Sequence, residues 1–486
     1  MNTFLDQFQA TCSIGAPRVF GGLTLYPIIQ HESKARDYLT LPEALGMEGF
    51  SIAEVDDHGI VPQVLVRNAL ERNVLLIDGE ELAGAKQNRV INTSILVPAR
   101  GQTIIPVSCT EIGRWRHATE KFMDSGLVMP PSMRARKMAS VSDSLRKSGE
   151  HYSDQGDVWD SIARFSAAAG HRSFTGAMRD VYVSRLAQLD EIQQSFVPCE
   201  GQVGLVAANN GSIIGLDWLS SADAYIQLAS KLIAGYSMQA VIDVAGSTEP
   251  VPEEEIRCFL DELGRCEELV FPGVGIGQEY RYHGLGGVGT ALLSDGQIVH
   301  GSFQAKYPEV PFARSYWVLP GRLLAGYYPG APTKGEAEQK LNALLQAGIR
   351  CVINLVEEEE RNEKGETMRP YHQLLAQAAA SRGLETSYVR TPVRDQDVPS
   401  APTMRLILDV IDAALQQRQP VYVHCWGGRG RTGTVVGCFL ARHGITRSER
   451  TLERISHLRR AEETSVKCSP DNEVQREMVR AWGQGA

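Results

Sequence analysis

The sequence predicts two domains of different fold class, a strand-rich mixed α+β domain over residues 1–305 and an α/β domain over residues 317–486. The chain of 486 residues has the length of about two to four domains. Its first part carries short alternating apolar runs between turn residues, which is typical of strands. Its second part alternates apolar strands with helical patterns, which predicts a central, mostly parallel sheet flanked by helices. Residues 306–316 contain two prolines and no clear period, so we expect them to form the linker.

Composition and charge restrict the class of protein. Hydrophobic residues make up 43% and charged residues 22%, which is the balance of a globular protein and excludes disordered, collagenous and coiled-coil chains. The net charge of −9 provides no general basic field, so we expect neither a nucleic-acid nor a membrane partner. The sequence contains no run of about 18 apolar residues and no secretion signal. Its nine cysteines form no C-x-x-C pair, which argues against disulfides and zinc and favours a cytoplasmic protein.

The elements of the first domain follow from apolar runs and the turn residues between them. Four early strands are expected at residues 64–66, 74–77, 94–97 and 103–107. Helical spacing is present within residues 157–196, 221–233 and 253–263, and a strand is expected at 202–208. The domain ends in a predicted hairpin of residues 289–293 and 297–300 around an Asp-Gly turn.

In the second domain, apolar runs typical of strands alternate with the spacing typical of helices. A strand pair is expected within residues 317–326. The apolar residues between 341 and 349 follow helical spacing, which predicts a helix there. A strand at 351–356, a helix at 404–411, a strand at 421–424 and a helix at 434–442 follow. This order is typical of an α/β domain of about 170 residues.

The strongest chemical signal follows the strand at 421–424. The strand ends at Cys425, and three glycines then allow backbone turns in which successive N–H groups point inward toward an anion. A helix that begins near Arg431 offers free N–H groups and the positive end of its dipole, which also favours a thiolate. The guanidinium of Arg431 can bind two phosphate oxygens. A buried structural cysteine is the alternative, but such a residue needs neither the glycines nor the arginines.

The pattern His-Cys-x-x-Gly-x-x-Arg-Thr after a strand resembles the cysteine-based protein-tyrosine phosphatase superfamily, in particular its dual-specificity type, over about residues 315–486. The resemblance implies a dual-specificity phosphatase-like fold and a hydrolase that uses no metal and no other cofactor. It implies that Cys425 attacks phosphorus and forms a phosphocysteine, and that Arg431 binds the phosphoryl oxygens. The hydroxyl of Thr432 would then aid breakdown of the intermediate.

Further residues of the loop and of the C-terminal segment are implied by the same resemblance. The residues expected to contact the substrate are Trp426, Gly427, Gly428, Arg429, Gly430 and Gly433. An exposed loop position is an equal alternative for Arg429. His424 is expected to support the loop from beneath through hydrogen bonds, and a proton donor is the alternative. Gln475 ends a Ser-Pro-x-x-x-x-Gln segment and is expected either to contact the site or to lie on a helix surface.

The chemistry also requires an acid, because the leaving alkoxide or phenoxide must be protonated. The superfamily supplies an aspartate from an upstream loop, and Asp395 stands at that position, four residues before Pro399. Asp397 is the second candidate. Arg394 precedes Asp395 where the family often has proline, and a solvated acidic turn is the alternative interpretation.

Three functions are compatible with these residues. The first is a phosphomonoesterase that acts on phosphorylated tyrosine, serine or threonine of a protein substrate. The second is a phosphatase of a nucleotide or an ADP-ribose-derived phosphoester. The third is an interaction module that binds phosphate without turnover, and the complete set of Cys425, Arg431, Thr432 and an acid argues against it.

The first domain carries a dense polar cluster without a recognised activity. It consists of Glu80, Glu81, Lys86, Gln87, Arg89, Glu111 and Arg114. With these residues the domain resembles a bacterial domain associated with ADP-ribosylglycohydrolases and rhodanese/phosphatase-superfamily proteins, whose ligand or partner is unknown. The cluster either lines a polar binding site or consists of turn and strand-edge charges. The basic segment 132–147 is expected to be a solvated helix or loop.

Overall fold

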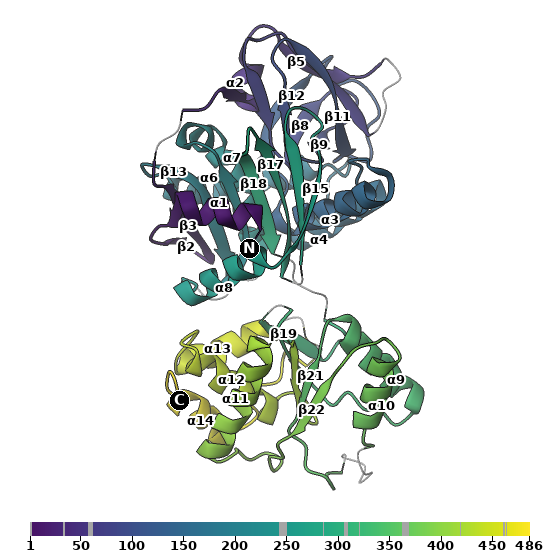
Figure 1. Ribbon diagram of the computed structural model, residues 1–486, viewed down its shortest axis with the longest axis vertical. Helices are drawn as coiled ribbons and strands as arrows, with labels where there is room; N and C mark the ends of the chain where they lie inside the picture. The colour runs from purple at the N-terminus through teal and green to yellow at the C-terminus, as the bar shows by residue number, and fades with distance from the viewer. Residues whose placement is uncertain are drawn as a thin grey trace. The chain divides into compact units, whose positions relative to one another are not determined.

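The computed structural model describes residues 2–32, 35–56, 62–242, 250–284, 286–305, 310–319, 321–361, 369–417, 419–459, 462 and 464–486. The chain divides into two compact units, Met1–Lys306 and Tyr307–Ala486 (Figure 1). The predicted two-domain architecture, with a strand-rich N-terminal region, is thereby confirmed. Among the described helices, none is long and apolar enough to cross a membrane.

The largest sheet of the N-terminal unit is antiparallel throughout its described strands. Its strand order is β1-β3-β13-β14-β18-β17-β16-β15, and β2 pairs with β3. The strands are β1 (Cys12–Ile14), β2 (Arg18–Phe20), β3 (Leu23–Gln30), β13 (Gln202–Asn209), β14 (Ser212–Leu219), β15 (Glu267–Pro272), β16 (Gln278–His283), β17 (Gly287–Ser294) and β18 (Gln297–Ala305).

Alternation along the strands buries both faces of this sheet. Leu205 and Val206 are consecutive residues of β13 and belong to different apolar cores. Helices α1 (Thr3–Thr11) and α8 (Glu253–Gly264) contribute to the core that contains Val206. Helix α7 (Ala222–Ile242) contributes to the other core and continues past its predicted end at residue 233 (Figure 1).

Two smaller sheets complete the strand-rich unit. An antiparallel sheet of order β12-β8-β9-β11-β6-β5 contains β5 (Phe50–Glu54), β6 (Gln63–Asn68), β8 (Glu80–Gly84), β9 (Arg89–Ile91), β11 (Gly101–Cys109) and β12 (Phe122–Val128). A short sheet joins β10 (Ile95–Val97), β7 (Asn73–Leu76) and β4 (Tyr38–Thr40). The remaining helices are α2 (Leu41–Leu45), α3 (Pro131–Ser148), α4 (Gln155–Ala168), α5 (Met178–Val183) and α6 (Leu186–Ser195).

The basic segment 132–147 forms the expected helix, and three of its five cations are exposed, but the other two are buried. It lies in α3, where Arg134 and Lys137 are 1% and 2% exposed. The guanidinium of Arg134 forms two hydrogen bonds of 2.9 Å with the carboxylate of Asp217, and Lys137 Nζ lies 2.7 Å from Asp78 Oδ2. Charge can be buried here because each cation meets a carboxylate in the interior. The sequence alone does not show these partners, since they come from distant strands and turns.

The described residues of the C-terminal unit form a five-stranded sheet, and helices pack on both of its faces. Its order is β19-β20-β23-β21-β22, and only the β19–β20 pair of these is antiparallel. The strands are β19 (Ser315–Leu319), β20 (Leu323–Gly326), β21 (Cys351–Asn354), β22 (Ser387–Arg390) and β23 (Val421–His424). Helices α9 (Lys334–Gln346) and α10 (His372–Ala380) pack on one face. Helices α11 (Ala401–Gln416), α12 (Gly430–Arg442), α13 (Glu449–Leu458) and α14 (Glu473–Ala481) pack on the other.

The predicted linker 306–316 extends too far at its C-terminal end. Ser315 and Tyr316 already belong to β19, where they pair with Gly326 and Ala325. Tyr316 is 3% exposed, so burial of its ring holds this segment in the sheet. Residues 306–309 of the predicted linker lie outside the described residues.

Candidate active site

The parallel strands of the C-terminal unit end at one edge of the sheet. Their last residues are aligned, since Gly326 and Asn354 both pair with His424, and Asn354 pairs with Arg390. The loops that follow β21, β22 and β23 therefore leave the sheet at the same edge. This arrangement brings together side chains that are far apart in the sequence.

The glycine-rich loop surrounds the sulfur of Cys425 with backbone. Cys425 is 3% exposed, and the N–H of Gly428 donates to its Sγ at 3.3 Å. Gly428 has a φ of +76°, and a Cβ atom there would lie 2.6 Å from the carbonyl carbon of Gly326. Only glycine therefore fits this turn, as the sequence predicted. Arg314 Nη2 holds the loop from outside by donating to the carbonyl of Gly427 at 3.0 Å.

His424 lies fully buried, and both of its ring nitrogens contact hydrogen-bonding groups. Its Nε2 forms a short hydrogen bond with the hydroxyl of Tyr371, and its Nδ1 lies 3.1 Å from the carbonyl of Cys425. The rings of Tyr328, Tyr371 and Tyr422 pack around the imidazole, each at a centroid distance of 5.5 Å. Burial lowers the pKa of His424 from 6.5 to about 3. The imidazole is therefore neutral near pH 7 and fixes the loop without adding charge.

The guanidinium of Arg431 is held by carboxylates from two other loops. Its Nη1 and Nη2 each donate at 2.7 Å to one oxygen of Glu360, and Nη2 lies 3.0 Å from Asp395 Oδ1. Its Nη1 also donates to the carbonyl of Val393 at 2.9 Å. Burial opposes the charge of Arg431, but the hydrogen bonds to Glu360 and the surrounding negative groups raise its pKa above the ordinary value. The guanidinium is thus permanently charged and oriented before a substrate arrives.

Sequence reasoning missed Glu360. It closes the run of four glutamates at 357–360, directly after the loop that follows β21. The run looks like a solvated acidic turn, and only the fold shows that its last member is 11% exposed and bidentate to Arg431. A carboxylate after a parallel strand, at the edge where Cys425 lies, was the available signal.

The two candidate acids face different surroundings. The carboxylate of Asp395 is 60% exposed and contacts Arg431 of the site. The carboxylate of Asp397 instead accepts the N–H of Val398 at 2.8 Å, within its own turn. Between them, Gln396 adopts a left-handed φ of +58°. The turn therefore directs the first aspartate toward the guanidinium and the second away from it.

Residues 471–475, at the start of α14, contact both loops of the site. Asn472 Nδ2 donates to the carbonyl of Gln396 at 2.7 Å, and Gln475 Nε2 donates to the carbonyl of Asp397 at 3.2 Å. Gln475 is 0% exposed, so it does not lie on a helix surface. On the other side, Arg429 Nη1 lies 3.2 Å from Asp471 Oδ1, so Arg429 is not an unpaired loop residue.

The other predicted site residues lie in or directly behind the loop. Trp426, Gly427 and Arg429 are partly exposed, whereas Gly428 and Gly430 are buried. Thr432 and Gly433 begin α12 and are buried as well. A Cβ atom at Gly433 would lie 2.3 Å from Ser469 Oγ, which places this glycine in packing against the C-terminal segment. Thr432 Oγ1 donates to the carbonyl of Gly326 at 3.5 Å, a weak contact from which the hydroxyl can turn away.

A cavity of about 200 Å³ lies next to Tyr371 in the C-terminal unit. Tyr371, which forms the hydrogen bond to His424, is one of its lining residues, together with Lys334 and Arg369. Within the described residues, no group of three or more His, Cys, Asp or Glu side chains could hold a metal ion.

Two family models match the chain. Residues 11–304 match the ARG and Rhodanese-Phosphatase-superfamily-associated Protein domain. Residues 329–445 match the family described as "Polymorphic toxin system, DSP-PTPase phosphatase". The second match contains Asp395, Cys425 and Arg431.

Curated relatives match parts of the chain. The protein named "Putative tyrosine phosphatase 067L" of Invertebrate iridescent virus 3 is 29% identical over 131 residues, which are 26% of this chain and 45% of that protein. The uncharacterized protein MJ0215 of Methanocaldococcus jannaschii is 33% identical over 96 residues, which are 20% of this chain and 54% of that protein. The chain thus spans about half the length of these relatives.

Solved structures of phosphatases also match. TpbA of P. aeruginosa, in complex with pTyr, is 16% identical with a TM-score of 0.26, and the match covers 36% of this chain and 86% of that one. PTPMT1 in complex with PI(5)P is 21% identical with a TM-score of 0.26, covering 35% of this chain and 93% of that one. Because the first family match spans more than half of its length, the chain belongs to the ARG and Rhodanese-Phosphatase-superfamily-associated Protein family, and it carries a C-terminal domain of the dual-specificity and tyrosine phosphatase superfamily.

Proposed function

We propose that the C-terminal domain hydrolyses phosphomonoesters through a phosphocysteine intermediate, with Cys425 as the nucleophile. The observation that carries this proposal is the loop in which the backbone N–H of Gly428 donates to Cys425 Sγ, followed by the charged Arg431 guanidinium in the first turn of α12. A phosphoryl group in this loop meets a nucleophile below it and donors around it. Phosphorylated tyrosine, serine or threonine of a protein is the first candidate substrate.

Binding of the phosphoryl group begins with an exchange at Arg431. Both terminal nitrogens of its guanidinium already contact carboxylates, Glu360 on one side and Asp395 on the other. Glu360 is nearly buried and bidentate, whereas Asp395 is 60% exposed and makes a single contact. We therefore expect phosphate oxygens to replace Asp395 and not Glu360, which leaves Asp395 beside the leaving group.

The first chemical step forms the S–P bond and breaks the P–O bond to the leaving group. The thiolate of Cys425 supplies the electron pair, and protonated Asp395 transfers its proton to the departing oxygen. Arg431 and the loop N–H groups stabilise the negative charge on the phosphoryl oxygens in the transition state. His424 remains neutral and takes no part in proton transfer, since its pKa lies near 3.

The second step breaks the S–P bond again. Water attacks phosphorus, and the carboxylate of Asp395 accepts a proton from this water, so that inorganic phosphate and the thiolate of Cys425 result. In our proposal the Thr432 hydroxyl donates to the departing sulfur. The weak 3.5 Å contact of this hydroxyl in the free site makes that exchange inexpensive.

Substitution of the nucleophile tests the mechanism. Cys425→Ser should abolish hydrolysis of an activated aryl phosphate in the presence of a chelator, while vanadate affinity is largely kept because Arg431 and the loop remain. Cys468→Ser is the matched control, because Cys468 is exposed and should leave the rate unchanged. A Cys425→Ser protein that keeps more than about a tenth of the turnover would exclude the covalent mechanism.

The cavity next to Tyr371 supports a second candidate substrate, a small phosphoester with further negative groups such as a nucleotide or an ADP-ribose derivative. The cavity has about 200 Å³, and its lining includes the two cations Lys334 and Arg369. Steady-state rates on a phosphopeptide and on an ADP-ribose phosphate separate the two candidates. If the small polyanion is the substrate, Arg369→Ala should raise its KM and leave the KM of the phosphopeptide unchanged.

A further inference from the structure

Arg89 of the N-terminal unit is a fully buried cation whose hydrogen bonds are used on one side only. It begins β9, 0% exposed, opposite Cys109 of β11. Its Nη1 donates to Gln87 Oε1 at 2.9 Å and to Cys109 Sγ at 2.7 Å. Burial raises the pKa of Cys109 to about 11, so this sulfur is a neutral thiol near pH 7 and does not balance the charge of Arg89.

The other edge of the same guanidinium has no acceptor. Neither Nε nor Nη2 of Arg89 has a hydrogen-bond partner in the part of the chain that the structure describes. The nearest carboxylate contact is Glu54 Oε1, 3.8 Å from Nη2, which is too long for a hydrogen bond. The Nε and Nη2 donors lie on one edge of the planar group, in the geometry that binds two oxygens of a carboxylate or phosphate.

A half-exposed tryptophan packs against the guanidinium of Arg89. Trp115 is 50% exposed, and its ring centroid lies 5.7 Å from Arg89 Cζ and 5.7 Å from Lys86 Nζ. Lys86 is 8% exposed, so a second cation is present next to the buried one.

The structure shows which residues of the polar cluster lie near Arg89 and which do not. Gln87 contacts Arg89, and Lys86 shares the indole of Trp115 with it. Glu111 and Arg114 pair with each other at 2.6 Å and brace the same loop through the backbone N–H of Asn88 and the carbonyl of Ala85. Glu80 does not belong to this site, because it faces Lys231 at 2.8 Å.

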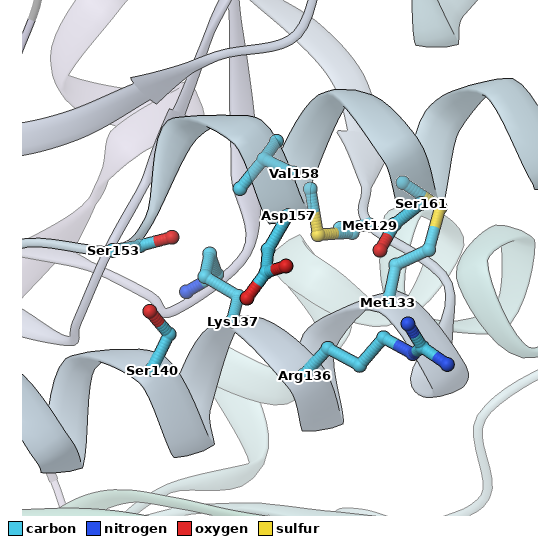
Figure 2. Close-up of a pocket in the computed structure, with 9 residues that line it drawn as sticks. All are labelled: Met129, Met133, Arg136, Lys137, Ser140, Ser153, Asp157, Val158 and Ser161. Carbon is cyan, nitrogen blue, oxygen red and sulfur yellow. The ribbon is translucent and has the colours of Figure 1, made fainter.

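The described N-terminal cavity between α3 and α4 offers no better site. It is lined by Met129, Met133, Arg136, Lys137, Ser140, Ser153, Asp157, Val158 and Ser161 (Figure 2). Its volume of about 10 Å³ holds one water molecule and no larger ligand.

We propose that the N-terminal domain binds the oxyanion group of a small molecule, a phosphate or a carboxylate, on the Nε–Nη2 edge of Arg89 beneath Trp115. Glu54 is the competing group, because its carboxylate lies on the same side of the guanidinium and repels an anion. The site is independent of the phosphatase chemistry, since none of its residues belongs to the C-terminal unit.

Fluorine NMR of the full chain with 5-fluorotryptophan tests this site. Trp115→Phe assigns the Trp115 signal, and the probes are inorganic phosphate and succinate. Arg431→Met is introduced as background so that the C-terminal loop does not bind the phosphate. A saturable shift of the Trp115 signal with either probe is expected, and the probe that saturates identifies the oxyanion as phosphate or carboxylate. No saturable shift with either probe overturns the proposal.

Two substitutions distinguish a ligand site from an internal ion pair. Arg89→Lys should weaken binding by about tenfold or more, because lysine lacks the two-donor edge, whereas Arg100→Lys on the surface should not. Glu54→Gln should tighten binding, since it removes the repelling charge and keeps an acceptor for the N–H of Lys86. If Glu54→Gln instead lowers the melting temperature and binding is absent, Glu54 is the natural partner of Arg89 and the proposal is wrong. The Glu54→Gln result stands even if Arg89→Lys fails to fold.

Discussion

Removing the amide donor of Asn472 should impair only the step that needs the acid. Its Nδ2 donates to the carbonyl of Gln396, the left-handed residue between the two candidate acids. Asn472 also caps α14, because its side chain accepts the N–H of Gln475 at 3.0 Å. Asn472→Ser keeps a cap oxygen and loses the donor, so it releases the acid loop without unfolding the helix.

The expected size of the effect follows from one hydrogen bond. A neutral hydrogen bond contributes about 1 kcal/mol net, which corresponds to about fivefold in an equilibrium. The backbone of Gln396, with its φ of +58°, gains other conformations once the contact is lost. We therefore expect kcat/KM for an alkyl phosphate to fall about fivefold, while an activated aryl phosphate, which needs little protonation, is hydrolysed at nearly the normal rate.

The assay is steady-state hydrolysis of both substrates by Asn472→Ser, Asp395→Asn and the double variant. The double variant should be no slower than Asp395→Asn alone, because the contact acts through that acid. Glu473→Gln is the control, since this exposed carboxylate contacts Arg476 and Arg480 and not the acid loop. Equal losses on both substrates, or additive losses in the double variant, would refute the positioning role.

Three further predictions follow from the same geometry. Asp395→Asn should slow an alkyl phosphate about 10²–10⁴-fold and Asp397→Asn much less, and steady-state rates with both leaving groups decide between them. Gly428→Ala should inactivate the loop, whereas Gly427→Ala, whose added Cβ would lie 4.0 Å from its nearest neighbour, should keep vanadate binding. The pKa of His424 is lower in the folded chain, so the free energy of unfolding should decrease as pH falls from 6.5 toward 3, by up to about 1.4 kcal/mol per pH unit. Urea unfolding at several pH values measures this dependence, and His424→Gln should flatten it.

The sequence by itself indicated the domain order and the glycine-rich loop that follows Cys425. Cys425, the glycines and Arg431 lie within a few residues, so their geometry is set by local backbone rules that the sequence states directly. The alternation of strands and helices likewise predicted the C-terminal sheet, whose β20, β21, β22 and β23 are parallel.

Only the tertiary structure decided which distant side chains meet. Glu360 and Asp395 reach Arg431 because parallel strands end at one edge, and the spacing to Pro399 that singled out Asp395 does not predict either ion pair. The same holds for Arg134 and Lys137, whose segment looked solvated until distant carboxylates were seen to pair with them inside the fold. Charge is compatible with burial only when a partner is present, and the partner is supplied by packing rather than by sequence neighbours.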